Sequence, residues 1–502
     1  MELTTILAAA VTLLGGLYLF FSYRYTYWKS RGVPFPKPTP VVGNFGFVIT
    51  GKKTFSAALK DMALPFKETG YCGIYQWSRP LLLVWDPEMI KQITCKDFSS
   101  FHDRGIPEHK HDALSQHLFN MSGTRWRNLR NKLSPTFTSG KLKLMFPLMR
   151  DIGVELSAQI AAEAKKADSH EVNISTLLSR YATDVIGSVA FGIQCNCLRD
   201  NDNEFQTMSK QVFRTSPAQF VRGILEAIHP KLGGLLPIWL VFSDVHRFFV
   251  NLMKDTVEYR EKNNVERNDF VQLMMQLRKA DLASMDPENH VELNPGVMAA
   301  QGFIFFIAGL DNISNTVAFA LSKLAANPEL QDKVANEVRD VLRQHDGELT
   351  YDALKKMDLV NRTALEALRL WNPIGFLFRK CNATTRVGDL TIEKGMMVFI
   401  MAQIAAMDEN NFPDPKRFDP DRHLPEVKET RHPYTFLPFG EGPRNCIAER
   451  FALLEMKLAL AMLLRDFVFS IGPSHKEEVE LDPKAFFPMP KDGFVLQVAA
   501  RA

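Results

Sequence analysis

Residues 439–448 read F-G-E-G-P-R-N-C-I-A, and they place a single cysteine, Cys446, at the start of an apolar helical pattern. The residues that set this pattern recur at roughly helical spacing, and they are Ile447, Phe451, Leu454, Leu458 and Met462. Free backbone N–H groups and the positive end of the helix dipole lie at the start of such a helix. This setting favours a thiolate over a thiol, so we expect Cys446 to be a ligating thiolate.

Three features of the stretch suit the binding of haem. A cysteine thiolate can ligate the haem iron and push electron density towards it, which favours O–O cleavage. Gly440 and Gly442 let the backbone pass close to a flat macrocycle without a side chain in the way. Arg444 can reach an anionic haem propionate. A lone cysteine is more often an inert buried side chain, but its combination with Phe439, two glycines and an arginine argues against that alternative.

The pattern from Phe439 to Cys446 resembles the haem-binding loop of the cytochromes P-450, F-x-x-G-x-R-x-C. The resemblance implies a mainly α-helical fold with small β-sheets, in which haem b lies between a long central helix and the helix after Cys446. It also implies that Cys446 is the axial ligand of the haem iron, with Phe439 and Arg444 among the haem contacts. It extends over nearly the whole chain, and finer features look like insect microsomal members of the detoxification type.

Length and composition agree with an enzyme that encloses a cofactor. The chain has 502 residues, of which 46% are hydrophobic, so it can form a large core. Its 60 basic and 57 acidic residues leave a net charge of +3, which is not the balance of a nucleic-acid-binding protein. Six scattered cysteines indicate a reducing compartment. No dinucleotide-binding glycine motif follows a strand, so electrons must come from another protein.

The N-terminus predicts a membrane anchor. Residues 3–21 carry no charge and are long enough to cross a bilayer as a helix. An aromatic belt at 18–28 and basic residues at 24–31 place the rest of the chain in the cytosol. The alternative is a cleaved signal peptide, but a basic n-region and a clear cleavage site are missing. We expect a single-pass protein of the endoplasmic reticulum membrane, divided into an anchor at 1–23, a Pro-rich hinge at 24–44 and a catalytic haem domain at 45–502.

Turn and cap signals divide the remaining chain into elements. Asp86 and Pro87 predict the start of a helix, as an N-cap residue followed by proline. The region from about 115 to 370 is mainly helical in pattern. Short strands are predicted at 71–76, 80–85, 387–390, 396–400, 467–471 and 494–498.

Glu366 and Arg369 share one face of a predicted helix and can form an ion pair. Such pairs are usually weak surface contacts, but apolar flanking residues here indicate burial. A buried pair needs further partners, and Arg422 is the candidate. The residues resemble the family's E-x-x-R motif and its P-E-R-F segment, although Asp421 and His423 stand where the family has Glu and Phe. The trio is assigned to folding and haem retention.

Trp126 and Arg130 lie one helical turn apart, where an indole N–H and a guanidinium can bind one carboxylate. Without further context, they are part of a basic helix face. The resemblance assigns them to a haem propionate, and it assigns Arg379 to another propionate contact.

The stretch 297–325 is apolar nearly all round and predicts a buried helix. It resembles the family's central helix over the haem, with its A-G-x-(D/E)-T-(T/S) motif. Ala308 leaves room beside the iron, and Asp311 fits the acidic position. Asn312 stands where the family has a threonine hydroxyl that helps deliver protons, and Thr316 lies one turn on. We expect a rearranged proton relay or leakier coupling, because an amide relays protons less readily.

The resemblance also indicates the substrate pocket. Its walls come from segments 102–118, 213–220, 303–308, 374–378 and 486–489, and the candidate residues are Phe303, Phe306, Ile374, Phe376 and Phe487. So many phenylalanines suit bulky apolar substrates, although aromatic residues are also ordinary core. A further apolar patch at 229–242 either dips into the membrane or belongs to the core.

The implied function is the insertion of one oxygen atom into an apolar molecule, such as a xenobiotic, plant toxin, insecticide or endogenous lipophile. Electrons would come from NADPH through NADPH-cytochrome reductase, with cytochrome b5 as a second donor. Two alternatives stay open. One is a haem-thiolate isomerase or dehydratase that needs no reductase, which Asn312 favours. The other is a non-catalytic haem-binding protein or sensor.

Overall fold

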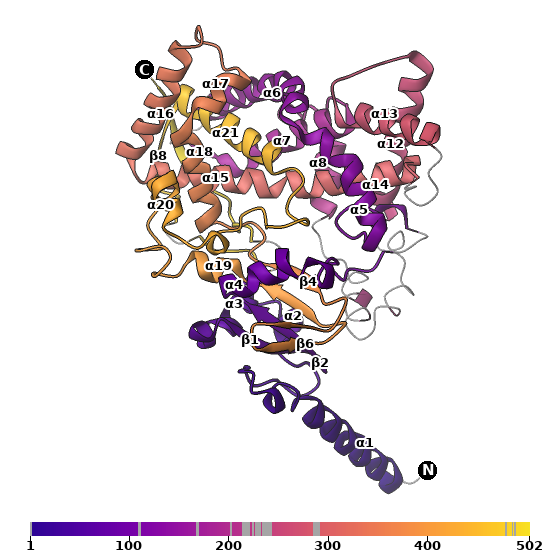
Figure 1. Cartoon of the computed structure of the whole chain (residues 1–502). Coiled ribbons are helices and arrows are strands. Elements are labelled where there is room, and N and C mark those ends of the chain that lie inside the picture. The colour runs from indigo at the N-terminus through magenta and orange to yellow at the C-terminus, as the bar shows by residue number, and fades with distance from the viewer. Residues whose placement is uncertain are drawn as a thin grey trace.

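Helices make up most of the molecule, and a small sheet occupies the end nearest the N-terminal helix (Figure 1). The computed structural model describes residues 3–108, 112–166, 170–200, 203–212, 221–222, 225, 232, 243–284, 292–476, 479–483, 485 and 488–501. The expected mainly helical fold with small sheets is confirmed. Three predictions concern parts of the chain that lie outside the described residues: the pocket segment 213–220, most of the apolar patch at 229–242, and Phe487.

The helices follow the predicted distribution, with the densest run between residues 123 and 370. They are α1 Leu3–Arg24, α2 Gly46–Thr50, α3 Phe55–Ala63, α4 Pro87–Lys91, α5 Gly123–Leu133, α6 Ser139–Lys166, α7 Ile174–Ile186, α8 Glu204–Val212, α12 Ser243–Asn263, α13 Phe270–Ser284, α14 Pro295–Gly309, α15 Asp311–Ala325, α16 Pro328–Arg343, α17 Tyr351–Lys356, α18 Asp358–Leu370, α19 Ala402–Ala406, α20 Pro425–Glu429 and α21 Glu449–Asp466. At the start of α4 the Asp86 side chain accepts a hydrogen bond from the Met89 N–H at 2.8 Å, so the predicted cap is confirmed.

Three small sheets join distant parts of the chain. The largest has the order β1-β2-β7-β4, and its β2 and β7 are parallel whereas the other neighbours are antiparallel. The second has the order β3-β9-β8, and β5 and β6 form a hairpin. The strands are β1 Tyr71–Gln76, β2 Arg79–Val84, β3 Glu171–Asn173, β4 Leu377–Lys380, β5 Thr385–Val387, β6 Leu390–Ile392, β7 Met397–Ile400, β8 Phe467–Ser470 and β9 Val495–Ala500.

One strand prediction was wrong. We expected residues 387–390 to form a strand, but they form the turn between β5 and β6. Gly388 has a φ of 55°, which lies in the left-handed region and is incompatible with extended backbone. The apolar residues Val387 and Leu390 therefore face one another across a hairpin instead of following one strand.

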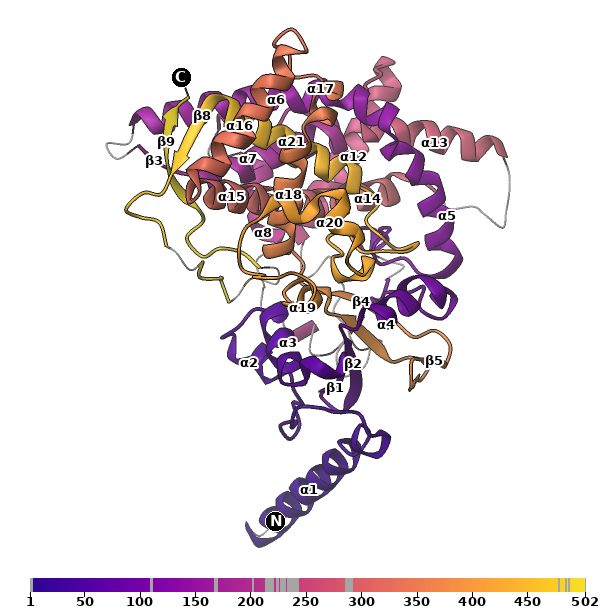
Figure 2. The ribbon, with the colours of Figure 1, turned by 60° about the vertical axis from the view of Figure 1, so that its left-hand side comes forward.

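The N-terminal helix α1 projects away from the folded body (Figures 1 and 2). The span Leu7–Arg31 is long enough to cross a membrane, and no part of its apolar 18-residue stretch is buried in the protein. The span Pro295–Ala325 passes the same length test, but 61% of its apolar 18-residue window is buried inside the protein, so it is a core element. The apolar N-terminal helix is therefore the candidate membrane anchor.

The aromatic residues in the last turns of α1 and just after it do not all form the expected interfacial belt. Tyr23 is 75% exposed, whereas Trp28 is only 3% exposed. The Trp28 indole N–H donates to the carbonyl oxygen of Ile74 at 3.1 Å, and a side chain at Gly73 would collide with the indole ring. Trp28 therefore packs on strand β1, so the segment after the anchor is attached to the sheet.

The central helix is interrupted at Leu310, which has φ −72° and ψ −83°. We expected one continuous helix over 297–325, but α14 ends at Gly309 and α15 begins at Asp311. The Asn312 side-chain amide donates to the Ala308 carbonyl oxygen at 2.9 Å. A regular helix offers that oxygen to the backbone N–H of residue 312. Side chains that compete for helix carbonyls in this way bend helices.

The core around the break is formed by long helices. Helix α15 packs against α7, α18 and α21, and most of its side chains are buried. Helix α21 also packs against α6, α16 and α18. These contacts fix the direction of α21, and with it the loop that carries Cys446 (Figure 2).

Candidate active site

The Cys446 loop has a backbone that only glycine can follow at two positions. Gly440 and Gly442 have φ values of 73° and 80°. A Cβ atom at Gly442 would collide with the carbonyl oxygen of Thr94, so a side chain is also excluded by packing. The Cys446 N–H donates to the carbonyl oxygen of Phe439 at 2.8 Å, which closes the loop just before α21. The predicted motif therefore forms a rigid turn.

The electrostatic setting of Cys446 differs from the expectation. Burial raises the pKa of the thiol, and the Glu449 carboxylate adds to this effect. The Ala448 N–H and the guanidinium groups of Arg130 and Arg104 act in the opposite direction but do not outweigh burial. The polypeptide by itself thus favours the thiol, and the positive charge of a bound iron would favour the thiolate.

Two predicted arginines hold this loop. The Arg444 side chain is fully buried and donates to the carbonyl oxygens of His102 and Met121, both at 2.7 Å. Arg130 donates to the backbone and side-chain oxygens of Asn445, at 2.8 and 2.7 Å. Both arginines therefore connect neighbours of Cys446 to other elements of the fold.

Trp126 and Arg379 complete the predicted cofactor set on this side. Trp126 is 4% exposed, and the guanidinium carbon of Arg444 lies 4.0 Å from the centre of its ring. Arg379 is buried, and its Nε has no hydrogen-bond partner among the described residues. Burial lowers the pKa of Arg379 to about 10 and that of Arg444 to about 9.

Sequence reasoning did not single out a fourth arginine, Arg104, although it lies in the segment 102–118 that was expected to line the pocket. It donates to the carbonyl oxygens of Phe119 and Arg444, at 3.2 and 3.1 Å. Burial lowers its pKa, and the nearby charges of Arg379, Arg444 and Arg130 lower it further. No local sequence signal identifies this residue, because the loop from Phe101 to Gly105 shows no helical or strand periodicity.

The four arginines form an excess of positive charge, with Arg379 and Arg444 buried and Arg104 and Arg130 partly buried. Asp103, 3.6 Å from Arg444, is the one carboxylate within ion-pair distance of them in the described part of the chain. Buried charges need compensation by opposite charge, and the unpartnered Nε of Arg379 is a donor without an acceptor. A dianionic group beside Cys446 satisfies both requirements, so these residues fit the two propionates of haem b.

The break between α14 and α15 carries the residues that were predicted to lie over the haem. Ala308 is exposed although Phe306 and Leu310 are buried, so one face of the helix borders accessible space. Burial raises the pKa of Asp311 to about 6. The Thr316 hydroxyl is directed back to the helix and donates to the Asn312 carbonyl oxygen at 2.6 Å.

The predicted pocket residues lie in two different environments. Phe306 is fully buried in an aromatic cluster with Phe191 and Phe249. Phe376 packs against Phe55, with ring centres 5.2 Å apart, in the core of the small sheet. Phe303 and Ile374 are partly exposed, as a pocket wall requires. The role of these residues in substrate binding stays a prediction.

The predicted structural trio is brought together, with one addition. The Arg369 guanidinium donates to both carboxylate oxygens of Glu366, at 2.9 and 2.8 Å, and all of these atoms are buried. The Nε of Arg422 lies 3.6 Å from Glu366, and its Nη2 donates to the Asp414 carbonyl oxygen instead. His423 is the closer partner, with Nε2 2.9 Å from Glu366.

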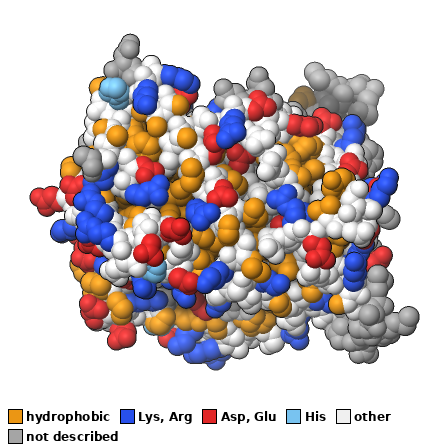
Figure 3. Space-filling model, turned by 90° about the horizontal axis from the view of Figure 1, so that it is seen from above, with side chains coloured by type: hydrophobic (Ala, Val, Ile, Leu, Met, Phe, Trp, Pro, Cys, Tyr) orange, Lys and Arg blue, Asp and Glu red, His pale blue; other side chains and the backbone are white. Residues whose placement is uncertain are grey.

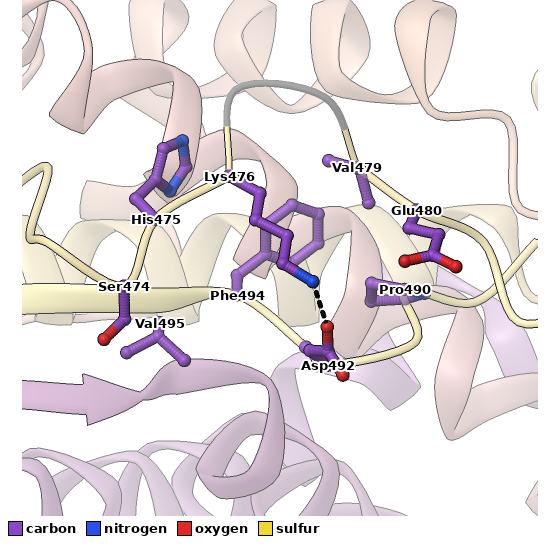
Figure 4. Close-up of a pocket in the computed structure, with 10 residues that line it drawn as sticks. Ser474, His475, Lys476, Val479, Glu480, Pro490, Asp492, Phe494 and Val495 are labelled. Carbon is purple, nitrogen blue, oxygen red and sulfur yellow. Dashed lines mark hydrogen bonds and ion pairs between the residues drawn. The ribbon is translucent and has the colours of Figure 1, made fainter.

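Two surface cavities lie away from Cys446. The smaller one, of about 40 Å³, is crossed by the ion pair between Lys476 and Asp492, and Phe494 lines it (Figure 4). It belongs to the loop region beside the β3-β9-β8 sheet, so it is not the catalytic site. The larger one, of about 270 Å³, is lined by residues of α16 and by Arg465 and Arg501.

Comparisons with known proteins point to one family. A model of the family Cytochrome P-450 matches residues 33–498. Cytochrome P-450 6a2 of Drosophila melanogaster is 36% identical over 502 residues, which cover 98% of each chain. The probable cytochrome P-450 6a14 of the same species is 36% identical over 504 residues, with 98% of this chain and 99% of the relative covered. Cytochrome P-450 6a8 is 36% identical over 507 residues and 99% of both chains.

Proposed function

Because the chain belongs to the cytochrome P-450 family, we propose that it oxidises lipophilic small molecules with electrons delivered from NADPH by NADPH-cytochrome reductase. Its activity as a P-450 monooxygenase and its cofactor, haem b, come with the family. Redox partners serve the family generally, and cytochrome b5 is proposed as a second donor. The observation that carries the proposal is the convergence of buried and partly buried arginines on the loop of one cysteine.

The haem supplies oxygen activation when it is bound, and Cys446 is its proposed axial ligand. Arg130, Arg379 and Arg444, with Arg104, would hold the propionates, since guanidinium groups bind carboxylates through paired donors. Trp126 and Phe439 would lie beside the macrocycle, and Ala308 leaves space on the opposite side. These residues bind and orient the cofactor but transfer no proton.

Proton delivery is proposed to depend on Asp311. A carboxyl group with a pKa of about 6 exchanges its proton readily near neutral pH. The Asn312 side-chain amide donates to the Ala308 carbonyl oxygen, and the Thr316 hydroxyl donates to the Asn312 carbonyl oxygen. A relay through Asp311 is therefore better supported than one through residue 312.

The substrate class follows from the accessible residues of the pocket. Phe303 and Ile374 are apolar and partly exposed, Ala308 is apolar and exposed, and Asp311, one turn after Ala308, adds a partly exposed carboxyl group. Such walls favour bulky apolar molecules, which include xenobiotics, plant toxins, insecticides and endogenous lipophiles. The apolar helix α1 supports anchoring in a membrane, proposed to be that of the endoplasmic reticulum, with the catalytic domain on the cytosolic side.

The decisive experiment is the carbon-monoxide difference spectrum of the reduced protein, followed by turnover. A thiolate-type Soret band that disappears in Cys446→Ala is expected, together with product formation that requires NADPH and reductase. Product without reductase would instead indicate a rearranging or dehydrating enzyme. Ligand-induced spectra without product from a broad panel of lipophiles would indicate a binding protein.

A further inference from the structure

The larger surface cavity, of about 270 Å³, collects four arginines from three parts of the fold. Arg339 and Arg343 lie one turn apart on α16, Arg465 lies in the last turn of α21, and Arg501 follows β9. No other charged residue lines the cavity, and its remaining walls are Ala335, Leu342 and Gly347. We call it the arginine pocket.

The arginine pocket carries more positive charges than aspartate partners. Three of its arginines have aspartate partners, which are Asp340 for Arg343 at 2.9 Å, Asp466 for Arg465 at 2.6 Å and Asp332 for Arg501 at 2.8 Å. Arg339 is exposed and forms no ion pair or hydrogen bond with any described residue. Four arginines thus face three aspartates, so one positive charge remains uncompensated.

The floor of the arginine pocket is apolar. Ala335 and Leu342 are 2% and 6% exposed, and they belong to the main hydrophobic core. A ligand that fills the space must therefore combine an apolar body with an anionic group. A guanidinium fork binds the planar pair of oxygens of a carboxylate or a sulfonate well. The volume suits a small organic molecule rather than a protein segment.

The position of the arginine pocket separates it from the membrane and from the catalytic site. Helix α16 and the C-terminus lie at the end of the molecule opposite to α1 (Figures 1 and 2). Seen from above, Lys and Arg side chains gather along the edge on the side of α16 (Figure 3). Helix α21 has 18 residues, so it separates Arg465 from the Cys446 loop by about 27 Å.

We propose that the arginine pocket is a binding site for a singly charged organic anion with a small apolar body, taken up from the aqueous phase and independent of the haem site. Arg339 supplies the unpaired positive charge, Arg343 and Arg465 flank the anionic group, and Leu342 contacts the apolar body. The proposal requires no role for the ligand in the monooxygenase reaction.

The test uses 2-naphthalenesulfonate as the probe and the full-length, haem-loaded protein in lipid nanodiscs. Calorimetric titration is expected to show saturable binding to one site, with no change in the Soret band. Arg339→Glu is expected to weaken binding at least about tenfold, because it replaces a charge-assisted contact by repulsion. The matched control is Lys333→Glu, an exposed charge reversal on the same helix outside the pocket.

A second variant and an uncharged probe complete the design. Arg343→Glu is expected to weaken binding as well, and its side chain is 68% exposed, so folding is not at risk. Neutral 2-naphthol is expected to bind only at the haem site, where it shifts the Soret band. The proposal is overturned if the wild type shows no saturable binding at millimolar sulfonate. It is equally overturned if Arg339→Glu leaves the affinity unchanged, or if sulfonate binding always accompanies a Soret shift.

Discussion

His423 Nε2 lies 2.9 Å from a carboxylate oxygen of Glu366, which also receives both N–H donors of Arg369. Two buried side chains therefore share one carboxylate through three N–H groups, with the backbone N–H of Asp419 as a further donor at 3.0 Å. Burial lowers the pKa of His423, although the Glu366 carboxylate raises it in part. The imidazole is thus neutral at neutral pH and donates its Nε2 hydrogen to Glu366.

The first prediction concerns this histidine. His423→Phe is expected to lower the free energy of unfolding by roughly 1–2 kcal/mol, because a hydrogen bond to a buried charge is lost and ring burial returns only part of it. Chemical denaturation of the haem-loaded protein measures the change. An unchanged stability would show that Arg369 alone satisfies Glu366.

The same residue predicts a dependence on pH. A histidine whose pKa is lowered in the folded state contributes stability above its ordinary value of 6.5, and this contribution is lost as the pH falls below it. The melting temperature of the wild type is therefore expected to fall between pH 7 and pH 5 more steeply than that of His423→Phe. Parallel curves for the two proteins would contradict this assignment.

The second site for a prediction is Asn312. Asn312→Thr is expected to increase the amount of product per NADPH several-fold, because a hydroxyl replaces an amide that is bound to the Ala308 carbonyl. NADPH consumption, peroxide and product are measured together. Asn312→Ala is the control, since it frees the same carbonyl without adding a hydroxyl. Equal coupling in both variants and the wild type would remove residue 312 from the relay.

Asp311 offers a prediction with a defined pH window. A carboxyl whose pKa is raised from 3.8 to about 6 destabilises the folded state increasingly as the pH rises through that interval. Asp311→Asn is therefore expected to raise the melting temperature relative to the wild type more at pH 7 than at pH 4. It should also lower turnover, while the carbon-monoxide spectrum stays unchanged. An equal shift in melting temperature at both pH values would show that the pKa of Asp311 is not raised by burial.

Haem retention tests the arginine that sequence reasoning missed. Arg104→Ala is expected to reduce the haem content and to accelerate haem loss to an acceptor protein, because a partly buried cation of the proposed propionate site is removed. Arg104→Lys keeps the charge without the paired donors, so its haem content and its rate of haem loss should lie between those of the wild type and Arg104→Ala. Arg127→Ala, an exposed arginine on α5, is the control. Equal retention in Arg104→Ala and this control would exclude Arg104 from the haem site.

Trp28 predicts how the anchor is attached. Trp28→Ala is expected to cost about 3–5 kcal/mol of local packing and to expose residues 25–33 to protease. Tyr23→Ala changes a residue that is 75% exposed and should leave the digestion pattern unchanged. If both variants are cleaved like the wild type, the indole does not hold the segment on β1.

Much of the fold follows from patterns within the sequence. The cap at Asp86, the strand at 71–76 and the helix after Cys446 are local features, in which each signal lies within a few residues of the element. The hairpin at 387–390 was misjudged because two apolar residues next to a glycine read equally well as one strand or as a turn.

The features that escaped prediction depend on contacts between distant segments. Arg104 joins the other arginines only after the loop before α5 folds against the Cys446 loop. The break at Leu310 arises from a side chain that competes with the backbone, which no periodicity reveals. Phe306 and Phe376 are buried in aromatic clusters, and a phenylalanine in an apolar segment carries no sign of which face it occupies, so their place in the pocket stays a prediction.

The parallel pairing of β2 with β7 has a consequence for synthesis of the protein. Leu81 pairs with Met397, so β2 cannot pair with β7 until roughly 300 further residues have left the ribosome. At about 5–20 residues per second, the wait lasts on the order of 15–60 s. During that time the apolar edge from Leu81 to Val84 has no partner on one side, while α1 is already free to enter the membrane. A nascent chain of this protein therefore needs protection at β2, and chaperone dependence should end when β7 emerges.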